Sequence, residues 1–90
     1  MLIGVDIGTG GTKALMLDER GRPLGEAFHE YGVLTPRPSW AEQWPDVWLE
    51  AVTIVLKDVL ARSGLNPKDV AAVAISGLYG GSGIPVDKAG

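Results

Sequence analysis

The first third of the chain alternates apolar positions with small or polar ones in three stretches. Residues 2–7 combine this alternation with β-branched side chains, which predicts a buried strand, and residues 12–17 predict a second strand. The sequence Asp-Glu-Arg-Gly at 18–21 has aspartate first and glycine last, as type I turns prefer, so a third strand is expected at 23–31. Together these stretches predict a three-stranded antiparallel meander.

A long stretch with helical periodicity follows. Pro45 suits the first position of a helix, and Gly64 suits the position directly after the last turn. Trp44 precedes this helix and cannot cap it, which costs about 1 kcal/mol. A short capped turn is expected at 66–69. The apolar residues that predict the helix recur at intervals of three to four: Val47, Trp48, Ala51, Val52, Val55, Leu56, Val59 and Leu60.

The remaining segments predict a loop and a further strand. The prolines at 36 and 38 forbid a helix, so residues 32–43 are expected to form an extended loop packed by Trp40. Residues 70–76 carry no charge, which is typical of a strand buried on both faces. Residues 84–87 are expected to begin another strand, followed by a turn at 87–90.

This order of elements predicts an α/β fold. It consists of an antiparallel three-strand meander, a crossover helix, a parallel strand and the start of a further hairpin. Because crossover connections are right-handed, the last full strand should lie parallel to the first. In such sheets ligands bind at the carboxyl ends of the strands. The glycine-rich residues 8–11 and 77–83 are therefore expected at one edge of the sheet.

Composition narrows the class of protein. Ninety residues, of which 46% are hydrophobic and 21% charged, fit one domain. The chain has no cysteine, which excludes a disulfide framework and thiol chemistry, and its single histidine argues against a histidine-based metal site. A net charge of −3 argues against a nucleic-acid surface, so no DNA or RNA partner is expected.

No membrane partner is expected either. The amino terminus lacks a basic region and carries Asp6 within its apolar run, unlike a secretory signal. No predicted element has the length and apolar character of a membrane-spanning helix. We therefore expect a cytoplasmic protein.

Residues 6–13 read Asp-Ile-Gly-Thr-Gly-Gly-Thr-Lys and gather groups that suit phosphate and magnesium. A carboxylate ends the predicted strand, glycines let backbone N–H groups approach an anion, and two hydroxyls and an ammonium accompany them. The segment is not a P-loop, which requires Gly-Lys-Ser/Thr. It is not a dinucleotide fingerprint, because Lys13 stands where the third glycine belongs and a strand follows. From spacing alone, a tight hairpin with glycines at positive φ and no ligand explains it equally well.

These residues resemble the phosphate-binding hairpin that opens the FGGY carbohydrate kinases, which have the RNase H-like fold of the actin-like ATPases. Ser-Trp-Ala-Glu-Gln at 39–43, followed by a Pro-Asp-x-Trp helix start, resembles that family's Gly-Trp-x-Glu-Gln segment. Val-Ala-Ile-Ser-Gly at 73–77 resembles its next core strand. The resemblance is closest to xylulokinase-like members. It implies transfer of the γ-phosphate of ATP to a hydroxyl of a sugar or polyol.

The resemblance also implies roles for particular residues. Asp6 would hold Mg²⁺ through water. In the family the general base is a later aspartate, so no catalytic residue is expected within this chain. Residues 1–90 would be the N-terminal portion of the first domain, which is incomplete and inactive alone. Thr9, Gly10 and Gly11 would cradle the phosphates of ATP, and Thr12 and Lys13 would support or contact them. Gly8 would belong to the same nucleotide site.

The sugar site is implied for the turn after the 70–76 strand, at Ser76, Gly77, Leu78, Tyr79 and Gly80. Xylulokinase-like members usually read Gln-Met-His-Gly there. In this chain Tyr79 falls on the methionine position and Gly80 on the histidine position, so an imidazole is lost and a phenol gained. A tyrosine can stack on a sugar face or pack on its own loop. The sequence therefore does not name the sugar.

Several alternatives stay open. Glu42 and Gln43 either face the sugar cleft or solvate the loop, whereas Trp40 and Trp48 are expected in the core. A ROK-type kinase of the same superfamily shares the hairpin pattern, although the Trp-Ala-Glu-Gln segment argues against it. From another class, a non-catalytic α/β module that binds an anion or a partner protein is the alternative. The oligomeric state is open, with a homodimer among the options.

Overall fold

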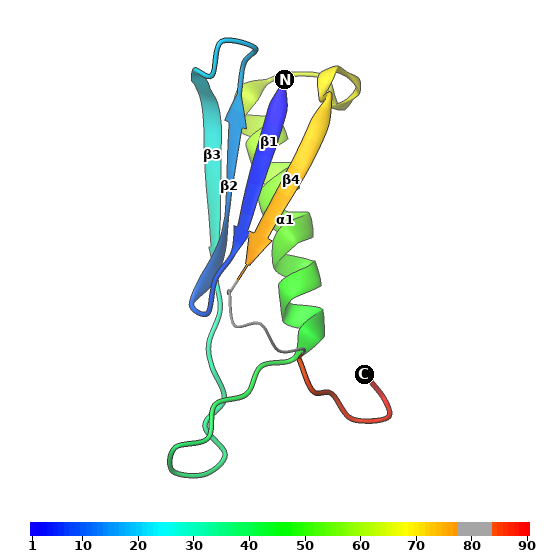
Figure 1. Ribbon diagram of the computed structural model, residues 1–90. Coiled ribbons are helices and arrows are strands. Elements are labelled where there is room, and N and C mark those ends of the chain that lie inside the picture. Colours follow the sequence, from blue (N-terminus) through cyan, green and yellow to red (C-terminus); the bar gives the residue numbers. More distant parts are fainter. Residues whose placement is uncertain (78–83) are drawn as a thin grey trace.

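The computed structural model describes residues 1–77 and 84–90, which form a four-stranded sheet with a long helix on one face (Figure 1). The order of the strands in the sheet is β3-β2-β1-β4. The predicted order of three strands, a helix and a fourth strand is confirmed. The strands are β1 (Leu2–Ile7), β2 (Gly11–Leu17), β3 (Pro23–Glu30) and β4 (Ala72–Gly77), and the helix is α1 (Pro45–Ser63).

The strands pair as the sequence predicts. β2 lies antiparallel to both β1 and β3, and β4 joins β1 in parallel after the helical crossover. The parallel ladder sets Asp6 beside Ser76 and Ile7 beside Gly77, so β1 and β4 end at the same edge. The α/β architecture with a meander and a parallel strand is therefore confirmed.

The two faces of the sheet differ because side chains alternate along each strand. α1 packs mainly against β2 and β3, on the face that carries the buried apolar side chains. The polar positions Asp6, Lys13 and Glu26 fall on the opposite face, which is open to solvent. The buried core is Ile3, Val5, Ala14, Met16, Ala27, Val55 and Val59.

The helix begins and ends where the sequence predicts. Pro45 is its first residue, and Gly64 follows its last turn in the left-handed conformation with φ at 68°. The N–H of Gly64 donates to the carbonyls of Leu60 and Ala61, a C-terminal arrangement that favours glycine. Trp44 makes no side-chain cap, as predicted.

Asp18 organises the turn between β2 and β3. Its Oδ1 accepts hydrogen bonds from the backbone N–H groups of Arg20 and Arg22, and its Oδ2 accepts one from Arg22 Nε at 2.9 Å. Gly21, at a φ of 77°, donates its N–H to the Asp18 carbonyl, which closes the predicted turn. These donors, first of all the backbone N–H of Arg22, hold the pKa of Asp18 below its ordinary value.

The prediction that the last strand is buried on both faces is wrong for this structure. β4 lies at the edge of the sheet, and all its residues are exposed. Val73 and Ile75 lie on the helix side of the sheet but are 47% and 60% exposed, because α1 covers β2 and β3 instead. An uncharged sequence indicates that a strand can be buried, not that something covers it.

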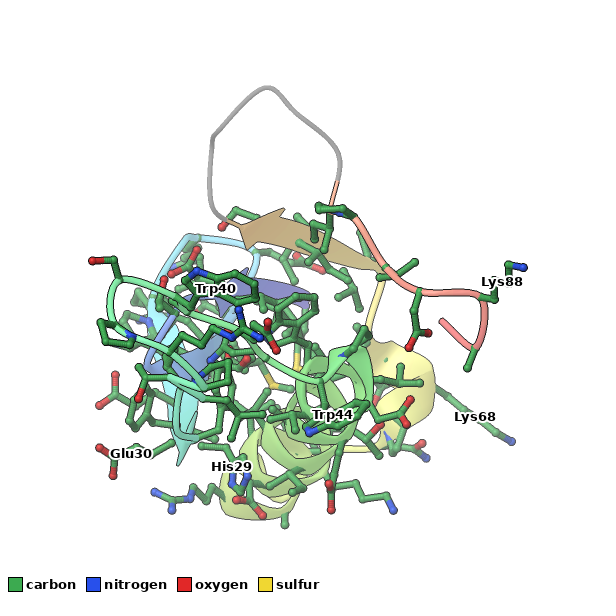
Figure 2. The ribbon with its side chains drawn as sticks, turned by 90° about the horizontal axis from the view of Figure 1, so that it is seen from below. His29, Glu30, Trp40, Trp44, Lys68 and Lys88 are labelled. Carbon is green, nitrogen blue, oxygen red and sulfur yellow. The ribbon has the colours of Figure 1, made fainter. Side chains whose placement is uncertain are left out.

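Residues 31–44, which we call the crossing segment, run from the end of β3 to the start of α1 (Figure 1). The segment is irregular, as its prolines require, with an isolated bridge between Leu34 and Glu42. Trp40 does not pack the loop or enter the core as expected, because it is 50% exposed, and its ring lies 4.9 Å from the Arg37 guanidinium. Figure 2 looks at the molecule from this end and labels Trp40 and Trp44.

The segments near the carboxyl end follow the sequence in part. The expected capped turn forms a short 3₁₀ helix (Pro67–Asp69), in which Asn66 accepts a hydrogen bond from the N–H of Lys68. Residues 84–87 do not form the expected strand, since no strand among the described residues pairs with them. The turn at 87–90 is present, with the N–H of Gly90 donating to the Asp87 carbonyl at 3.1 Å.

Candidate functional site at one edge of the sheet

Most of the described residues singled out from the sequence lie at one edge of the sheet. β1 and β4 end there side by side, so residues 8–11 follow β1 next to the end of β4. The end of β3, the crossing segment and the first turn of α1 lie at the same end of the molecule (Figure 1). Segments distant in sequence can therefore contact residues 8–11, which we call the glycine turn.

Three consecutive carbonyl groups of the glycine turn accept hydrogen bonds from the protein. The hydroxyl of Tyr31 donates to the carbonyl oxygen of Gly8, and the backbone N–H of Tyr31 donates to that of Gly10 at 3.1 Å. Nε2 of Gln43 donates to the carbonyl oxygen of Thr9 at 2.8 Å. These carbonyl oxygens are thereby turned toward the protein.

The peptide N–H groups of Thr9 and Gly10 point the other way. In a trans peptide the C=O and N–H bonds are antiparallel, and no described peptide bond is cis. Turning the carbonyls of Gly8 and Thr9 toward the protein therefore turns the N–H groups of the following residues outward. Thr9 and Gly10 are exposed, and neither N–H has an acceptor among residues 1–77 and 84–90. Adjacent outward N–H groups of this kind attract anions.

The glycines of the turn are explained by the space around them rather than by an unusual backbone conformation. None of Gly8, Gly10 and Gly11 has φ in the left-handed region, so a hairpin with glycines at positive φ does not describe this turn. A Cβ at Gly11 would lie 2.5 Å from Cζ of Phe28 and 2.8 Å from the His29 carbonyl oxygen. A Cβ at Gly10 would meet nothing within 4 Å. Packing thus requires glycine at 11, whereas the missing side chain at 10 leaves the backbone open to a ligand.

Asp6 and Lys13 are cross-strand partners on the open face of the sheet. Oγ of Ser76 donates to Oδ1 of Asp6 at 2.7 Å. Nζ of Lys13 lies 3.9 Å from the Glu26 carboxylate, a long exposed pair that contributes little stability. Asp6, Lys13 and Ser76 border a shallow hollow of about 340 Å³. A carboxylate, an ammonium and a hydroxyl therefore share one solvent-open surface close to the glycine turn.

Thr12 lies on the other face of the sheet. Its side chain has no exposed surface, and its Oγ1 is 3.1 Å from the hydroxyl of Tyr31. A buried hydroxyl is not placed to contact a phosphate, so of the two roles that the resemblance implies for Thr12 only indirect support of the phosphates, through Tyr31 and the glycine turn, fits this position.

Two of the expected sugar-site residues are described. Ser76 and Gly77 end β4 and are exposed at the same edge as the glycine turn. Leu78, Tyr79 and Gly80 lie outside the described residues.

The carboxylates at this edge suit a magnesium ion only when the ion is also bound to the phosphates of a substrate. In the part of the chain that the structure describes, no three His, Cys, Asp or Glu side chains cluster to hold a metal. Mg²⁺ is commonly bound by one or two carboxylates together with the phosphates of a substrate, and Asp6 can supply one such carboxylate.

Among residues 1–77 and 84–90, no helix has the length and apolar character needed to cross a membrane.

Sequence reasoning missed the two side chains that hold the turn. Tyr31 was expected only as the end of a strand, and Gln43 only as a residue of the cleft or of a solvated loop. The structure places both against carbonyls of the glycine turn. The motif at 39–43 pointed to the right segment, but not to its contact with residues 34 positions earlier.

Comparisons with known proteins agree with this geometry. The model of the FGGY family of carbohydrate kinases, N-terminal domain, matches residues 1–90. A glycerol kinase of Methylorubrum extorquens is 38% identical over 73 residues, which are 80% of this chain and 14% of the relative. A xylulose kinase of Escherichia coli is 34% identical over 82 residues, which are 91% of this chain and 16% of the relative.

Solved structures give the same result. A xyloylose kinase from Brucella ovis superposes with a TM-score of 0.78 at 35% identity, over 83% of this chain and 16% of that one. A gluconate kinase from Lactobacillus acidophilus superposes with a TM-score of 0.76 at 25% identity, over 84% of this chain and 15% of that one. The chain thus spans about one-seventh of the length of the relatives it matches.

Proposed function

Because the chain belongs to the FGGY family of carbohydrate kinases, we propose that it takes part in transferring the γ-phosphate of ATP to a hydroxyl of a sugar or polyol. Its four-stranded sheet and helix are those of sugar kinases with the actin-like ATPase fold. The activity is a proposal for the whole protein, since the relatives are several times longer than these residues.

One observation carries the proposal. The carbonyls of Gly8, Thr9 and Gly10 are bonded to the protein, which leaves the N–H groups of Thr9 and Gly10 directed to solvent. Phosphoryl transfer depends mainly on positioning and on neutralising charge, and backbone donors that need no reorganisation supply both. The glycine turn is thus suited to hold phosphate oxygens of ATP.

Asp6 and Lys13 complete the proposed nucleotide side of the site. When bound, Mg²⁺ would neutralise phosphate charge, and Asp6 would hold it through water. Ser76 keeps Oδ1 of Asp6 in place, while Oδ2 has no partner among the described residues. Lys13 is exposed beside Asp6, and its weak pair with Glu26 leaves its ammonium available to a phosphate.

The sugar side is proposed at the end of β4. Ser76 and Gly77 border the same edge, and the following Leu78, Tyr79 and Gly80 would extend the site. The general base would come from outside these residues, so we expect the 90-residue chain to be inactive alone and to act as the first portion of a kinase lobe.

The family match removes the ROK-type alternative. Since ATP is supplied inside cells, the cytoplasm is the proposed location.

The test is a phosphotransfer assay with the full-length product of the gene. Purified protein is incubated with MgATP and a panel that includes xylulose, glycerol and gluconate, the substrates in the relatives' names. Transfer to at least one alcohol is expected. In an Asp6→Asn variant it should fall about 100-fold or more, as for other losses of transition-state charge stabilisation, whereas Glu26→Gln should stay near the wild type. No transfer to any member of a broad sugar and polyol panel would contradict the proposal.

A further inference from the structure

Gln43 connects three parts of the molecule through one side-chain amide. Its Nε2 donates to the carbonyl oxygen of Thr9 at 2.8 Å and to that of Gly32 at 3.1 Å. Its Oε1 accepts a hydrogen bond from Nε1 of Trp48 at 3.0 Å. The glycine turn, the crossing segment and α1 are thereby linked through this amide.

The indole of Trp48 determines which way this amide faces. An indole N–H donates and cannot accept, so the oxygen of the amide must face Trp48. The NH₂ group then faces the other two partners, both of which are carbonyl oxygens and need donors. Trp48 is half-buried near the start of α1, so the orientation of the amide depends on a residue of a packed helix.

The contact with Thr9 sets the direction of one peptide of the glycine turn. Since this peptide is trans and planar, fixing its carbonyl toward Gln43 fixes the N–H of Gly10 outward. Tyr31 does the same for the preceding peptide, through the carbonyl of Gly8. If either brace were lost, the exposed turn could rotate a peptide and present a carbonyl oxygen to an incoming anion.

We propose that Gln43 is a positioning residue for nucleotide binding. It holds the Thr9–Gly10 peptide with its N–H toward the phosphates of ATP, and Trp48 acts through Gln43 by fixing the orientation of its amide. This inference rests on the proposed function of the glycine turn. It assigns to the crossing segment a role on the nucleotide side of the site.

The test compares Gln43→Met, which keeps length and removes both kinds of hydrogen bond, with Trp48→Phe, which removes the indole donor. Trp40→Phe is the matched control, because Trp40 is 50% exposed and the indole that donates to Gln43 is that of Trp48. The dissociation constant of MgATP is measured by calorimetry with the full-length product of the gene, next to the KM for its sugar and the melting temperature.

We expect the MgATP dissociation constant to rise about tenfold in Gln43→Met and about threefold in Trp48→Phe, the range expected for losing hydrogen bonds. It should stay unchanged in Trp40→Phe, and the sugar KM should stay within about twofold in all three variants, on the same scale. In the Gln43→Met background, Trp48→Phe should add nothing, since it acts through Gln43. If Gln43 and Trp48 contributed to stability alone, the substitutions would lower the melting temperature without raising the MgATP dissociation constant selectively over the sugar KM.

Two results would overturn the inference. One is a Gln43→Met variant that binds MgATP as the wild type does, or that loses nucleotide and sugar binding equally. The other is a full additional loss from Trp48→Phe in the Gln43→Met background. A wild type that does not bind MgATP at all would instead overturn the proposed function, and the inference with it.

Discussion

Oγ of Ser76 donates a hydrogen bond to Oδ1 of Asp6 at 2.7 Å, across 70 positions of sequence. The two residues are partners in the parallel ladder between β4 and β1. A residue at the end of one strand thus orients the carboxylate that we propose for magnesium, at the end of its neighbour. The parallel pairing of β1 and β4 therefore brings the proposed nucleotide and sugar sides of the site into direct contact.

Replacing Ser76 by alanine should therefore weaken the use of magnesium. The substitution leaves Asp6 charged but removes the donor that orients it, a loss of about 1 kcal/mol. The Mg²⁺ concentration that gives half-maximal phosphotransfer should rise several-fold, which a titration at saturating ATP measures. Thr53→Ala, which removes a hydroxyl from the exposed side of α1, serves as the control. An unchanged titration midpoint in Ser76→Ala would rule out this role.

Local signals in the sequence predicted much of the fold. Pro45 and Gly64 marked the ends of α1, because one fits a first helical position and the other a left-handed cap. The exposure of β4 and of Trp40 could not be predicted in this way, because burial depends on what lies over a residue. The braces from Tyr31 and Gln43 were missed for a related reason, since they join residues 23 and 34 positions apart.

The two neighbouring glycines of the turn should respond differently to substitution. Gly11→Ala places a Cβ against the Phe28 ring and the His29 carbonyl and should destabilise the protein by about 1–3 kcal/mol. Gly10→Ala meets open space and should leave stability unchanged while raising the KM for ATP. Urea unfolding and ATP kinetics on both variants separate the two effects. Equal unfolding midpoints in both variants would contradict the packing argument.

Truncating Phe28 should relieve the first of these effects only in part. In a Gly11→Ala, Phe28→Ala double variant the ring no longer opposes the new methyl group, but the backbone carbonyl of His29 still lies 2.8 Å from it. The double variant should therefore be more stable than additivity of the single variants predicts, yet less stable than Phe28→Ala alone. Strict additivity in urea unfolding would argue against the contact.

Asp18 should make the stability of the hairpin between β2 and β3 depend on pH. Its pKa is lowered in the folded protein, so its contribution is present above the unfolded pKa and is lost as pH falls through the folded value. Asp18→Asn should therefore be less stable than the wild type at pH 7, and the difference should shrink as pH falls below about 4. Urea midpoints across this pH range measure it, with Glu19→Gln as the control from the same turn. A difference that is independent of pH would contradict the role of the charge.

Supplying the missing helix cap should stabilise the protein. Trp44 has extended backbone angles, with φ at −79° and ψ at 128°, and its side chain is 63% exposed. Trp44→Asp should thus add a cap worth about 1 kcal/mol without loss of core packing. Trp44→Ala removes the same ring without adding an acceptor and should give no gain. Equal melting temperatures for the two variants would show that capping at this position has no effect.

The central claim is that the glycine turn holds the phosphates of ATP through outward backbone N–H groups. A crystal structure of the full-length product of the gene with Mg²⁺ and a non-hydrolysable ATP analogue tests it most directly. The account predicts a phosphate oxygen within about 3 Å of the backbone nitrogens of Thr9 and Gly10, with the Gln43 amide still bonded to the Thr9 carbonyl. Phosphates bound elsewhere, with the glycine turn in contact only with solvent, would contradict it.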